Sequence, residues 1–221
     1  MTLVGKSEPE SLLWLFFVMI GTMTKQIIAI DADDTLFDEN TAVRLYMNDH
    51  YGFQHTEADY LVEGSFDNYW ERIWNVNPEK MTQMYEEFAH SSYKKNLQPI
   101  EGAITILQKL KIKYELVIVT SRGQSVVDMT HQSLSAHYPD IFKVVHFVPL
   151  WGNSKKATKA QICDEIGASY LIDDSFEHCK LAAEANINAI VFGDYGWNRF
   201  QKLPNLTTRC KNWEEVWRIL G

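Results

Sequence analysis

The sequence predicts an α/β fold: a doubly wound, Rossmann-like parallel sheet with a helical cap inserted after the first strand. Short apolar runs rich in branched residues recur along the chain and are typical of strands buried on both faces of a parallel sheet. Helical patterns lie between these runs. Between the first run and the second, residues 41–96 contain no strand-like run and are rich in aromatic and charged residues. The alternation therefore predicts an α/β core, and the interruption predicts an insert.

The first strand is predicted at residues 27–30, and acidic side chains follow it directly. Asp31, Asp33 and Asp34 stand in the turn that leaves this strand. Open parallel sheets place their chemistry just beyond the carboxyl ends of the strands. Like charges this close repel unless a cation neutralises them or one group is protonated. We therefore predict a Mg²⁺ site built around a nucleophilic carboxylate.

The insert is predicted to be a small helical bundle over residues 38–97. A first helix runs onward from Ala42 and ends near Gly52, and residues 66–74 carry aromatic side chains at helical spacing. Pro78 suits the first turn of a further helix.

After the insert, the alternation of helix and strand resumes. Further strands are predicted at 116–119, 144–148, 170–172 and 189–192, with helices around 104–110, 125–137, 159–166 and 181–185. Right-handed crossovers would bring the carboxyl ends of these four or five strands to one edge of the sheet. The predicted division is a catalytic core of residues 24–37 and 98–221, the cap, and a leader of uncertain status, residues 1–23.

The leader contains an apolar stretch, residues 12–20, that is shorter than the roughly 20 residues needed to span a bilayer. Either an appended or incorrectly assigned start, or a cleaved signal or membrane-associating segment, would account for it. We expect no membrane association of the core.

Composition narrows the class of protein. Of 221 residues, 46% are hydrophobic and 23% charged, which is typical of a soluble globular protein. The net charge of −8 argues against a nucleic-acid polymer as partner. Three cysteines without ligand spacing are interpreted as reduced, which predicts a cytoplasmic location. The oligomeric state stays open.

Polar groups gather at three predicted strand ends. They are Asp31 and Asp33 after the first strand, Thr120, Ser121 and Arg122 after the second, and Asp173 and Asp174 after a later one. Lys159 precedes the last of these strands, with Lys155 and Lys156 as alternatives. A carboxylate nucleophile, an acid–base group, a hydroxyl, a cation and metal-binding carboxylates are together the parts of phosphoryl transfer.

In these motifs and their order, the chain resembles the haloacid dehalogenase-like hydrolase superfamily over residues 24–200; most members of this superfamily are phosphatases. The resemblance implies that Asp31 attacks phosphorus and forms an aspartyl-phosphate. It implies that Asp33 protonates the leaving oxygen and then deprotonates the hydrolytic water. Thr120 would hydrogen-bond the phosphoryl group, and Lys159 would balance its charge.

The resemblance also implies a Mg²⁺ site formed by the Asp31 side chain, the Asp33 backbone carbonyl and Asp174, with Asp173 in support. Magnesium prefers such oxygen ligands. Asp33 needs a raised pKa to act as an acid, and we expect its acidic neighbours to raise it. An acid at Asp33 also favours hydrolysis of phosphate esters over dehalogenation, because a halide needs no proton to leave.

Substrate phosphate is expected to contact Thr120, Ser121 and Lys159. Arg122 would either reach this phosphate or pair with an acid. The small phosphorylated substrate is then a nucleoside 5'-monophosphate, or alternatively a sugar phosphate or another small metabolite. A non-catalytic protein that binds a phosphate ligand is the third possibility.

Two features bear on the nucleotide hypothesis. Aromatic residues crowd the cap and its border and could stack on a base, or could simply pack the bundle's own core; they are Phe37, Phe53, Phe66, Tyr69, Trp70 and Trp74. The motifs are also similar to the 5'(3')-deoxyribonucleotidase-like branch, although Asp34 stands where glycine is common there. This departure leaves the geometry of the loop open. A further motif, residues 193–199, yields no chemistry of its own and is either a loop beside the active site or a turn.

Overall fold

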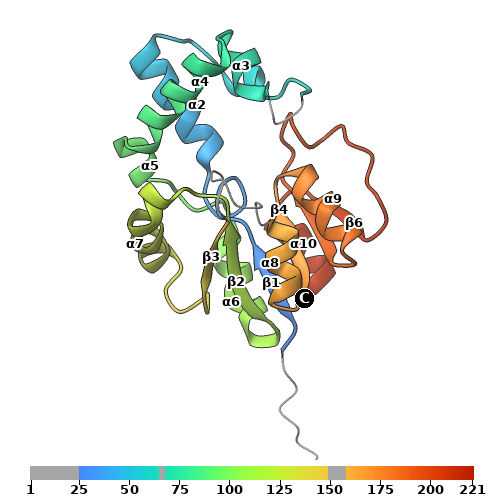
Figure 1. The fold of residues 1–221 in the computed structure, drawn as a ribbon. Coiled ribbons are helices and arrows are strands. Elements are labelled where there is room, and N and C mark those ends of the chain that lie inside the picture. The colour runs from blue at the N-terminus through green and yellow to red at the C-terminus, as the bar shows by residue number, and fades with distance from the viewer. Residues whose placement is uncertain (1–24, 65–67, 149–157) are drawn as a thin grey trace, which may run out of the picture.

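The computed structural model describes residues 25–64, 68–148 and 158–221. A parallel sheet lies between layers of helices, and a further group of helices stands over one edge of that sheet (Figure 1). The predicted leader lies outside the described residues. Among the residues that are described, none of the helices combines the length and the apolar character needed to cross a membrane.

The sheet has six parallel strands. They are β1 (Ile27–Ile30), β2 (Glu115–Thr120), β3 (Val145–Phe147), β4 (Ala168–Asp173), β5 (Asn188–Phe192) and β6 (Thr207–Cys210). Their spatial order is β3-β2-β1-β4-β5-β6, so the chain winds outward from β1 on one side and then outward from β4 on the other. The order reverses between β1 and β4, where a doubly wound sheet opens its binding crevice. The doubly wound parallel fold is therefore confirmed, with β6 in addition to the predicted strands.

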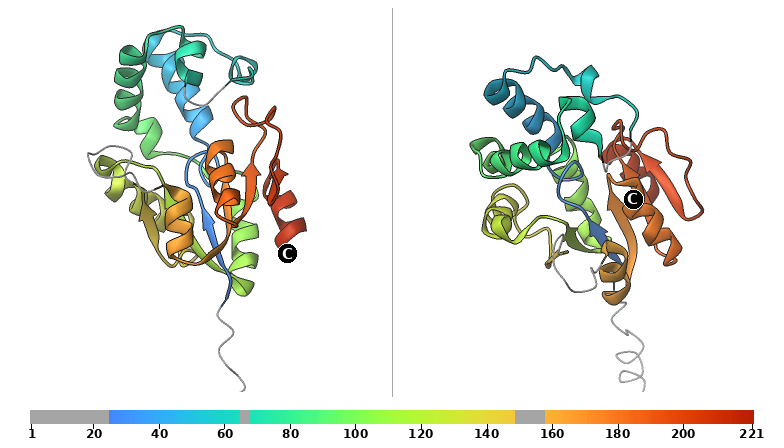
Figure 2. Two further views of the ribbon diagram at one scale, coloured as in Figure 1. Left: turned by 45° about the vertical axis from the view of Figure 1, so that its right-hand side comes forward. Right: turned by 45° about the horizontal axis from the view of Figure 1, so that its top comes forward.

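Helices cover both faces of this sheet (Figure 2). One face is covered by α6 (Ala103–Lys113), α7 (Val127–His137) and α10 (Trp213–Leu220), and the other by α8 (Lys159–Glu165) and α9 (Phe176–Glu184). A short 3₁₀ turn, η3 (Gln124–Val126), precedes α7. Within β1, Ile28 and Ile30 pack in the first core, whereas Ala29 packs in the second. Burial on both faces explains why β1 is an uninterrupted apolar run.

The segment between β1 and α6 is helical. Its elements are α2 (Glu39–Tyr51), η1 (Glu57–Tyr60), α3 (Tyr69–Trp74), α4 (Pro78–Ala89) and α5 (Ser92–Lys95). As expected, Pro78 is the first residue of α4, and α2 is capped by Gly52 with φ 72°. We call this group, residues 38–97, the helical segment.

Most aromatic side chains of the helical segment pack against one another. The cluster includes Tyr46, Tyr60, Tyr69, Trp70, Trp74 and Phe88, with Phe53 packed against it. Phe37 instead lies in the core of the sheet, and Phe66 lies outside the described residues. Of the two roles expected for these rings, packing against one another is the one that the structure supports, and Trp197 from outside the helical segment joins the same cluster.

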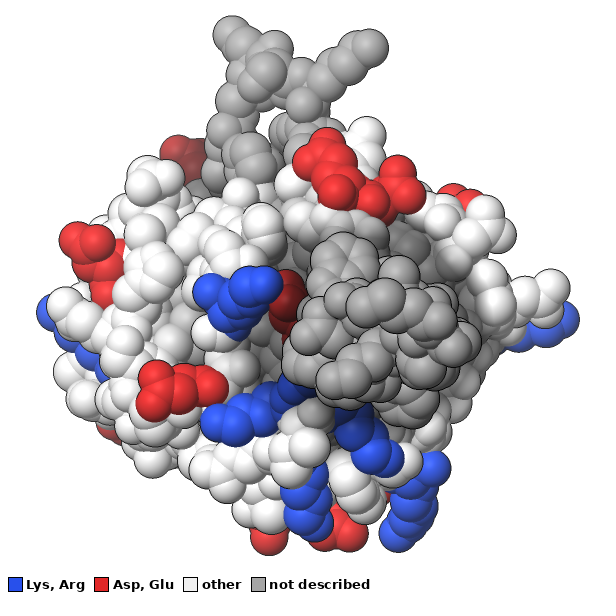
Figure 3. Space-filling view, turned by 90° about the horizontal axis from the view of Figure 1, so that it is seen from below, with Lys and Arg blue, Asp and Glu red and all other residues white. Residues whose placement is uncertain are grey.

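Figure 3 shows the end of the molecule opposite the helical segment. Basic and acidic side chains both occur among the described residues on this face, and neither sign covers it.

Candidate active site

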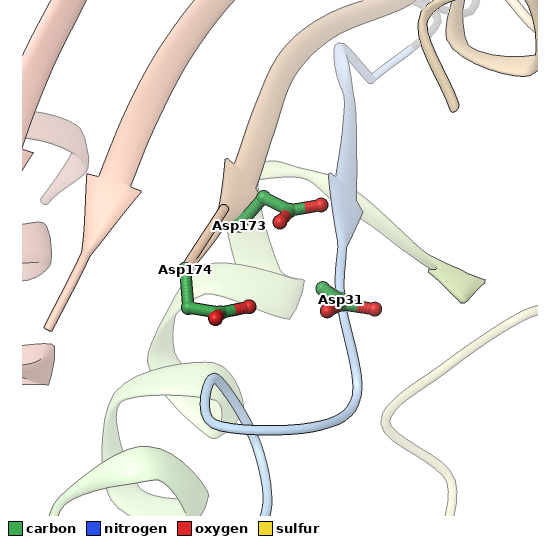
Figure 4. A group of neighbouring side chains, drawn as sticks. All are labelled: Asp31, Asp173 and Asp174. Atoms are coloured by element: carbon green, nitrogen blue, oxygen red, sulfur yellow. The ribbon is translucent and has the colours of Figure 1, made fainter. Parts of the chain in front are cut away.

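The carboxyl ends of β1 and β4 bring three aspartates together. The backbone N–H of Asp31 donates to the Ile172 carbonyl at 2.9 Å, which continues the β1–β4 pairing into the turn. One carboxylate oxygen from each of Asp31, Asp173 and Asp174 lies within 4.8 Å of the others, and all three residues are buried (Figure 4). These side chains lie at the ends of β1 and β4, which are neighbours in the sheet, although Asp31 and Asp173 are 142 residues apart in the sequence.

The charges of this group are not fully balanced. Burial raises the pKa of Asp31, against the opposing effect of Lys159, and burial together with Asp173 raises the pKa of Asp174 well above its usual range. These two carboxylates therefore gain stability from an additional cation. An all-oxygen donor set is what Mg²⁺ prefers, so the residues fit that ion.

Asp173 differs from the other two because its oxygens already have partners. Oδ1 accepts from the Ser175 backbone N–H at 2.9 Å, and Oδ2 accepts from Lys159 Nζ at 2.8 Å. His178 Nδ1 lies 3.2 Å from Oδ1. Although burial alone would raise it, the pKa of Asp173 is lowered by Lys159 and His178. The arrangement suits a residue that supports the site rather than one that binds the metal directly.

Lys159 connects Asp173 to Asp31. Its Nζ lies 2.7 Å from Asp31 Oδ1 and 2.8 Å from Asp173 Oδ2, and the residue is 2% exposed. The lysine is the first residue of α8, which is fixed by a capping box between Thr158 and Gln161. Lys155 and Lys156 lie outside the described residues.

Asp33 points toward cations rather than toward the acidic group. Arg122 donates two hydrogen bonds to the Asp33 carboxylate, from Nε to Oδ2 at 2.9 Å and from Nη2 to Oδ1 at 2.5 Å. Lys94 Nζ donates to Oδ1 at 2.9 Å. Burial would raise the pKa of Asp33, but Arg122 and Lys94 outweigh it and hold this pKa well below its usual range. The expectation of a raised pKa is therefore wrong, because the charges of these two cations, together with a hydrogen bond to Glu39, lower the pKa of Asp33 by more than its burial raises it.

Lys94 comes from α5 of the helical segment and was not foreseen from the sequence. It is 4% exposed and also donates to the Glu39 carboxylate, which accepts from the Tyr85 hydroxyl. Burial and the charge of Asp33 raise the pKa of Glu39 to about 7, with Lys94 opposing them. Nothing in the local pattern separates Lys94 from its neighbour Lys95, which is exposed, so only the tertiary fold reveals it.

The end of β2 supplies the remaining predicted groups. Thr120 is 1% exposed, and its Oγ1 accepts from the Arg122 backbone N–H at 3.3 Å. Ser121 is partly buried in the same turn. Arg122 also donates to Thr130 Oγ1 at 3.2 Å, so its guanidinium is fixed from two sides. Of its two expected roles, pairing with an acid is the one seen here.

With this geometry established, comparison with known proteins identifies the chain's relatives. The model of the family described as "5' nucleotidase, deoxy (Pyrimidine), cytosolic type C protein" matches residues 25–220. The chain belongs to this family. Membership in the type C nucleotidase family confirms the predicted relationship to haloacid dehalogenase-like phosphatases and the prediction that the chain is a phosphatase.

Curated relatives of the chain include members from bacteria and bacteriophages. The 5'(3')-deoxyribonucleotidases of Bacillus subtilis (strain 168) and Bacillus phage SPbeta are each 28% identical over 203 residues, covering 89% of this chain and 99% of theirs. An uncharacterized 32.4 kDa protein in the Gp30-rIII intergenic region of Enterobacteria phage T4 is 24% identical over 147 residues. That alignment covers 66% of this chain, and the chain spans only 52% of the phage T4 protein.

Solved structures agree with the fold. A haloacid dehalogenase-like family hydrolase from Streptococcus pneumoniae superimposes with a TM-score of 0.60 at 16% identity, covering 90% of this chain and 100% of that one. A subfamily IA hydrolase of the same superfamily from Geobacter sulfurreducens gives 0.54 at 17% identity, with 89% and 97% covered. At these identities the likeness concerns the fold alone.

The geometry of the turn at Asp34, which the sequence left open for this member of the type C nucleotidase family, is set by its backbone conformation. The φ of Asp34 is 53°, in the left-handed region that glycine adopts readily and aspartate tolerates better than most residues. Its Oδ1 accepts from the Asn40 backbone N–H at 2.8 Å, which anchors the start of α2. The turn thus has a backbone conformation that glycine would also adopt, and the acid adds a hydrogen bond to α2.

Proposed function

We propose that the chain is a Mg²⁺-dependent phosphomonoester hydrolase that acts through an aspartyl-phosphate on Asp31, with a nucleoside 5'-monophosphate as substrate. The observation that supports this most strongly is the buried group formed by Asp31, Asp173 and Asp174, with Lys159 bound to the first two. The Asp31 carboxylate lies beside the cation of Lys159 and close to the Asp174 carboxylate. This arrangement suits nucleophilic attack by Asp31 on a metal-bound phosphate ester.

In this proposal Asp31, Asp174 and the backbone carbonyl of Asp33 hold Mg²⁺, and Asp173 orients Lys159. The bound ion would neutralise the carboxylates and the phosphate, so that two negatively charged groups can approach each other. Burial of Asp31 and Asp174 and their raised pKa values support this assignment, because both features signal charge that the described side chains leave uncompensated.

The chain's own residues would then divide the chemistry. Asp31 supplies the attacking oxygen, and Lys159 and the hydroxyl of Thr120 stabilise the transferred phosphoryl group. Asp33 donates a proton to the leaving oxygen and then accepts one from the hydrolytic water. Ser121 and Arg122 would complete the phosphate contacts. Because Arg122 and Lys94 keep Asp33 ionised without substrate, its acid role requires these ion pairs to weaken when the negative ester enters. Its later role as a base needs no such change.

We further propose that the helical segment, residues 38–97, is a cap over a catalytic core of residues 24–37 and 98–221. An aromatic cluster formed mostly by residues of the helical segment supports this division, and Lys94, which extends from α5 to the turn after β1, places the segment over the candidate site. Caps in such enzymes exclude water and supply substrate contacts. A cytoplasmic location follows as a proposal from the composition and the three buried, unpaired cysteines.

The nucleotide substrate is supported by the family and by the deoxyribonucleotidase relatives. Two observations favour the alternative, a phosphatase of sugar phosphates or other small metabolites. Most rings of the helical segment pack in its own cluster, which leaves fewer of them for stacking on a base. A buried Lys94–Glu39 pair next to Asp33 also offers partners for hydroxyl groups of a leaving alcohol.

A substrate panel separates these candidates. Purified protein is incubated with deoxynucleoside 5'- and 3'-monophosphates, ribonucleotides, sugar phosphates and p-nitrophenyl phosphate, with Mg²⁺ or with EDTA, and released phosphate is measured. Mg²⁺-dependent turnover with the highest kcat/KM for nucleoside 5'-monophosphates supports the proposal. A clear preference for sugar phosphates overturns the nucleotide assignment, and no hydrolysis of any ester overturns the enzyme assignment. Asp31→Asn is the control for a contaminating phosphatase.

A further inference from the structure

The motif at residues 193–199, which the sequence left without a role, holds Asp174 in place. The Trp197 indole N–H donates to Asp174 Oδ2 at 2.8 Å, and Trp197 is 2% exposed. The Asn198 side-chain amide donates to the Asp174 backbone carbonyl at 2.8 Å and to the Phe192 carbonyl at 2.9 Å. Both the backbone and the carboxylate of Asp174 are therefore bound by this loop.

The Trp197 ring is fixed in turn by aromatic neighbours. Tyr195 stacks on it at 4.6 Å between ring centroids and 5° between planes. Tyr69 of α3 meets it edge-on at 5.0 Å, and Trp70 of α3 lies at 6.0 Å. Rings of both the core and the helical segment thus set the direction of the indole N–H.

Gly196 allows this close approach. A Cβ atom added there would lie 2.2 Å from the Val62 carbonyl oxygen and 2.4 Å from the Tyr69 hydroxyl oxygen. The Gly64 backbone N–H donates to the Gly196 carbonyl at 3.3 Å. Any larger residue at Gly196 would push the loop away from the helical segment and move Trp197 with it.

From these contacts we infer that Trp197 is a positioning residue for the proposed Mg²⁺ site, which it supports by binding one oxygen of Asp174 and leaving the other to the ion. The inference rests on the proposed function. A donor behind a metal-binding carboxylate fixes its rotamer and stabilises its charge, and loss of such a donor typically weakens metal affinity about 10- to 100-fold. Through the same ring, α3 of the helical segment contributes to the geometry of Asp174.

The test is Mg²⁺ binding without substrate, measured by isothermal titration calorimetry. Trp197→Phe keeps a ring in the cluster but removes the N–H, and Trp217→Phe is the matched control. Trp217 lies on α10, outside the candidate site, and Lys109 Nζ lies over its ring at 5.2 Å from the ring centroid. We expect the Mg²⁺ dissociation constant to rise about 10- to 100-fold in Trp197→Phe and to stay unchanged in Trp217→Phe. An unchanged constant in Trp197→Phe overturns the inference, even where its melting temperature falls.

Two further measurements keep the result decisive. In an Asp174→Asn background, Trp197→Phe should cause little additional loss of Mg²⁺ affinity, whereas a full additional loss would contradict action through Asp174. If Trp197→Phe does not fold, the indole N–H resonance of Trp197 in the native protein is followed by NMR. It should shift as Mg²⁺ is added, and a stationary resonance overturns the inference. Failure of the native protein to bind Mg²⁺ overturns the proposed function instead.

Discussion

The ammonium group of Lys94 lies 2.9 Å from the carboxylate of Asp33, a residue 61 positions earlier in the chain. Lys94 belongs to α5 of the helical segment, and Asp33 belongs to the turn after β1. This buried contact joins the helical segment to the turn after β1 by charge as well as by packing. On this side of the candidate site, Arg122 and Lys94 form ion pairs with Asp33 and Glu39.

Replacing Lys94 tests the importance of this cluster. Lys94→Met retains the aliphatic stem but leaves Glu39 buried without its cation, so we expect the free energy of unfolding to fall by about 3 kcal/mol. Urea denaturation followed by circular dichroism measures this change. Lys95→Met is the matched control, because Lys95 is the exposed neighbour in the same helix. Equal effects of the two substitutions would show that the buried pair contributes nothing specific.

The raised pKa of Glu39 predicts how stability changes with pH. The folded protein holds the proton up to about pH 7, whereas an unfolded chain releases it near 4.5. Between these values the folded state binds more protons, so stability declines as pH rises and levels off above about 7. Relative to Glu39→Gln, which does not titrate, the native protein should lose roughly 3 kcal/mol over this range. A constant difference between the two proteins from pH 4.5 to 7 would contradict the raised pKa.

Asp33→Asn tests the proton-transfer role. We expect kcat to fall by about 10²- to 10⁴-fold for esters with alkoxide leaving groups, which need a proton to depart. The loss should be much smaller for p-nitrophenyl phosphate, whose leaving group departs without one. Steady-state kinetics with both substrates, at saturating Mg²⁺, gives the comparison. Equal losses for both classes would assign Asp33 a structural role only.

Much of the fold could be predicted because five of the six strands carry their signal locally. The strand β1 is buried on both faces, so it is an uninterrupted apolar run, and this run predicts a parallel sheet without knowledge of the neighbouring strands. The strand β6 was missed because Thr207–Cys210 is a short edge strand with polar residues, which resembles a loop in sequence. The helix α4 was foreseen from Pro78, which suits a first helical turn and is a local feature.

The residues of the candidate site also differ in whether the sequence alone could predict them. Asp31 and Asp174 directly follow β1 and β4, and Thr120 is the last residue of β2, so topology alone brings them to one edge. Lys94 and Trp197 lie in segments whose sequences carry no such signal. Lys94 reaches Asp33 only because the helical segment packs against the core, and Trp197 reaches Asp174 through a contact between residues that are distant in sequence. The environment of Asp33 was misjudged for this reason, because sequence proximity showed its acidic neighbours but not its two cations.

The proposed mechanism requires that Asp31 becomes phosphorylated during turnover. Protein mixed rapidly with Mg²⁺ and a hydrolysable ester is quenched in acid, digested and mapped by mass spectrometry, with Asp31→Asn in parallel. We expect one phosphoryl group on the peptide that contains Asp31, and neither that group nor turnover in Asp31→Asn. Normal hydrolysis by Asp31→Asn, or a phosphoryl group on another residue of the active enzyme, would contradict it.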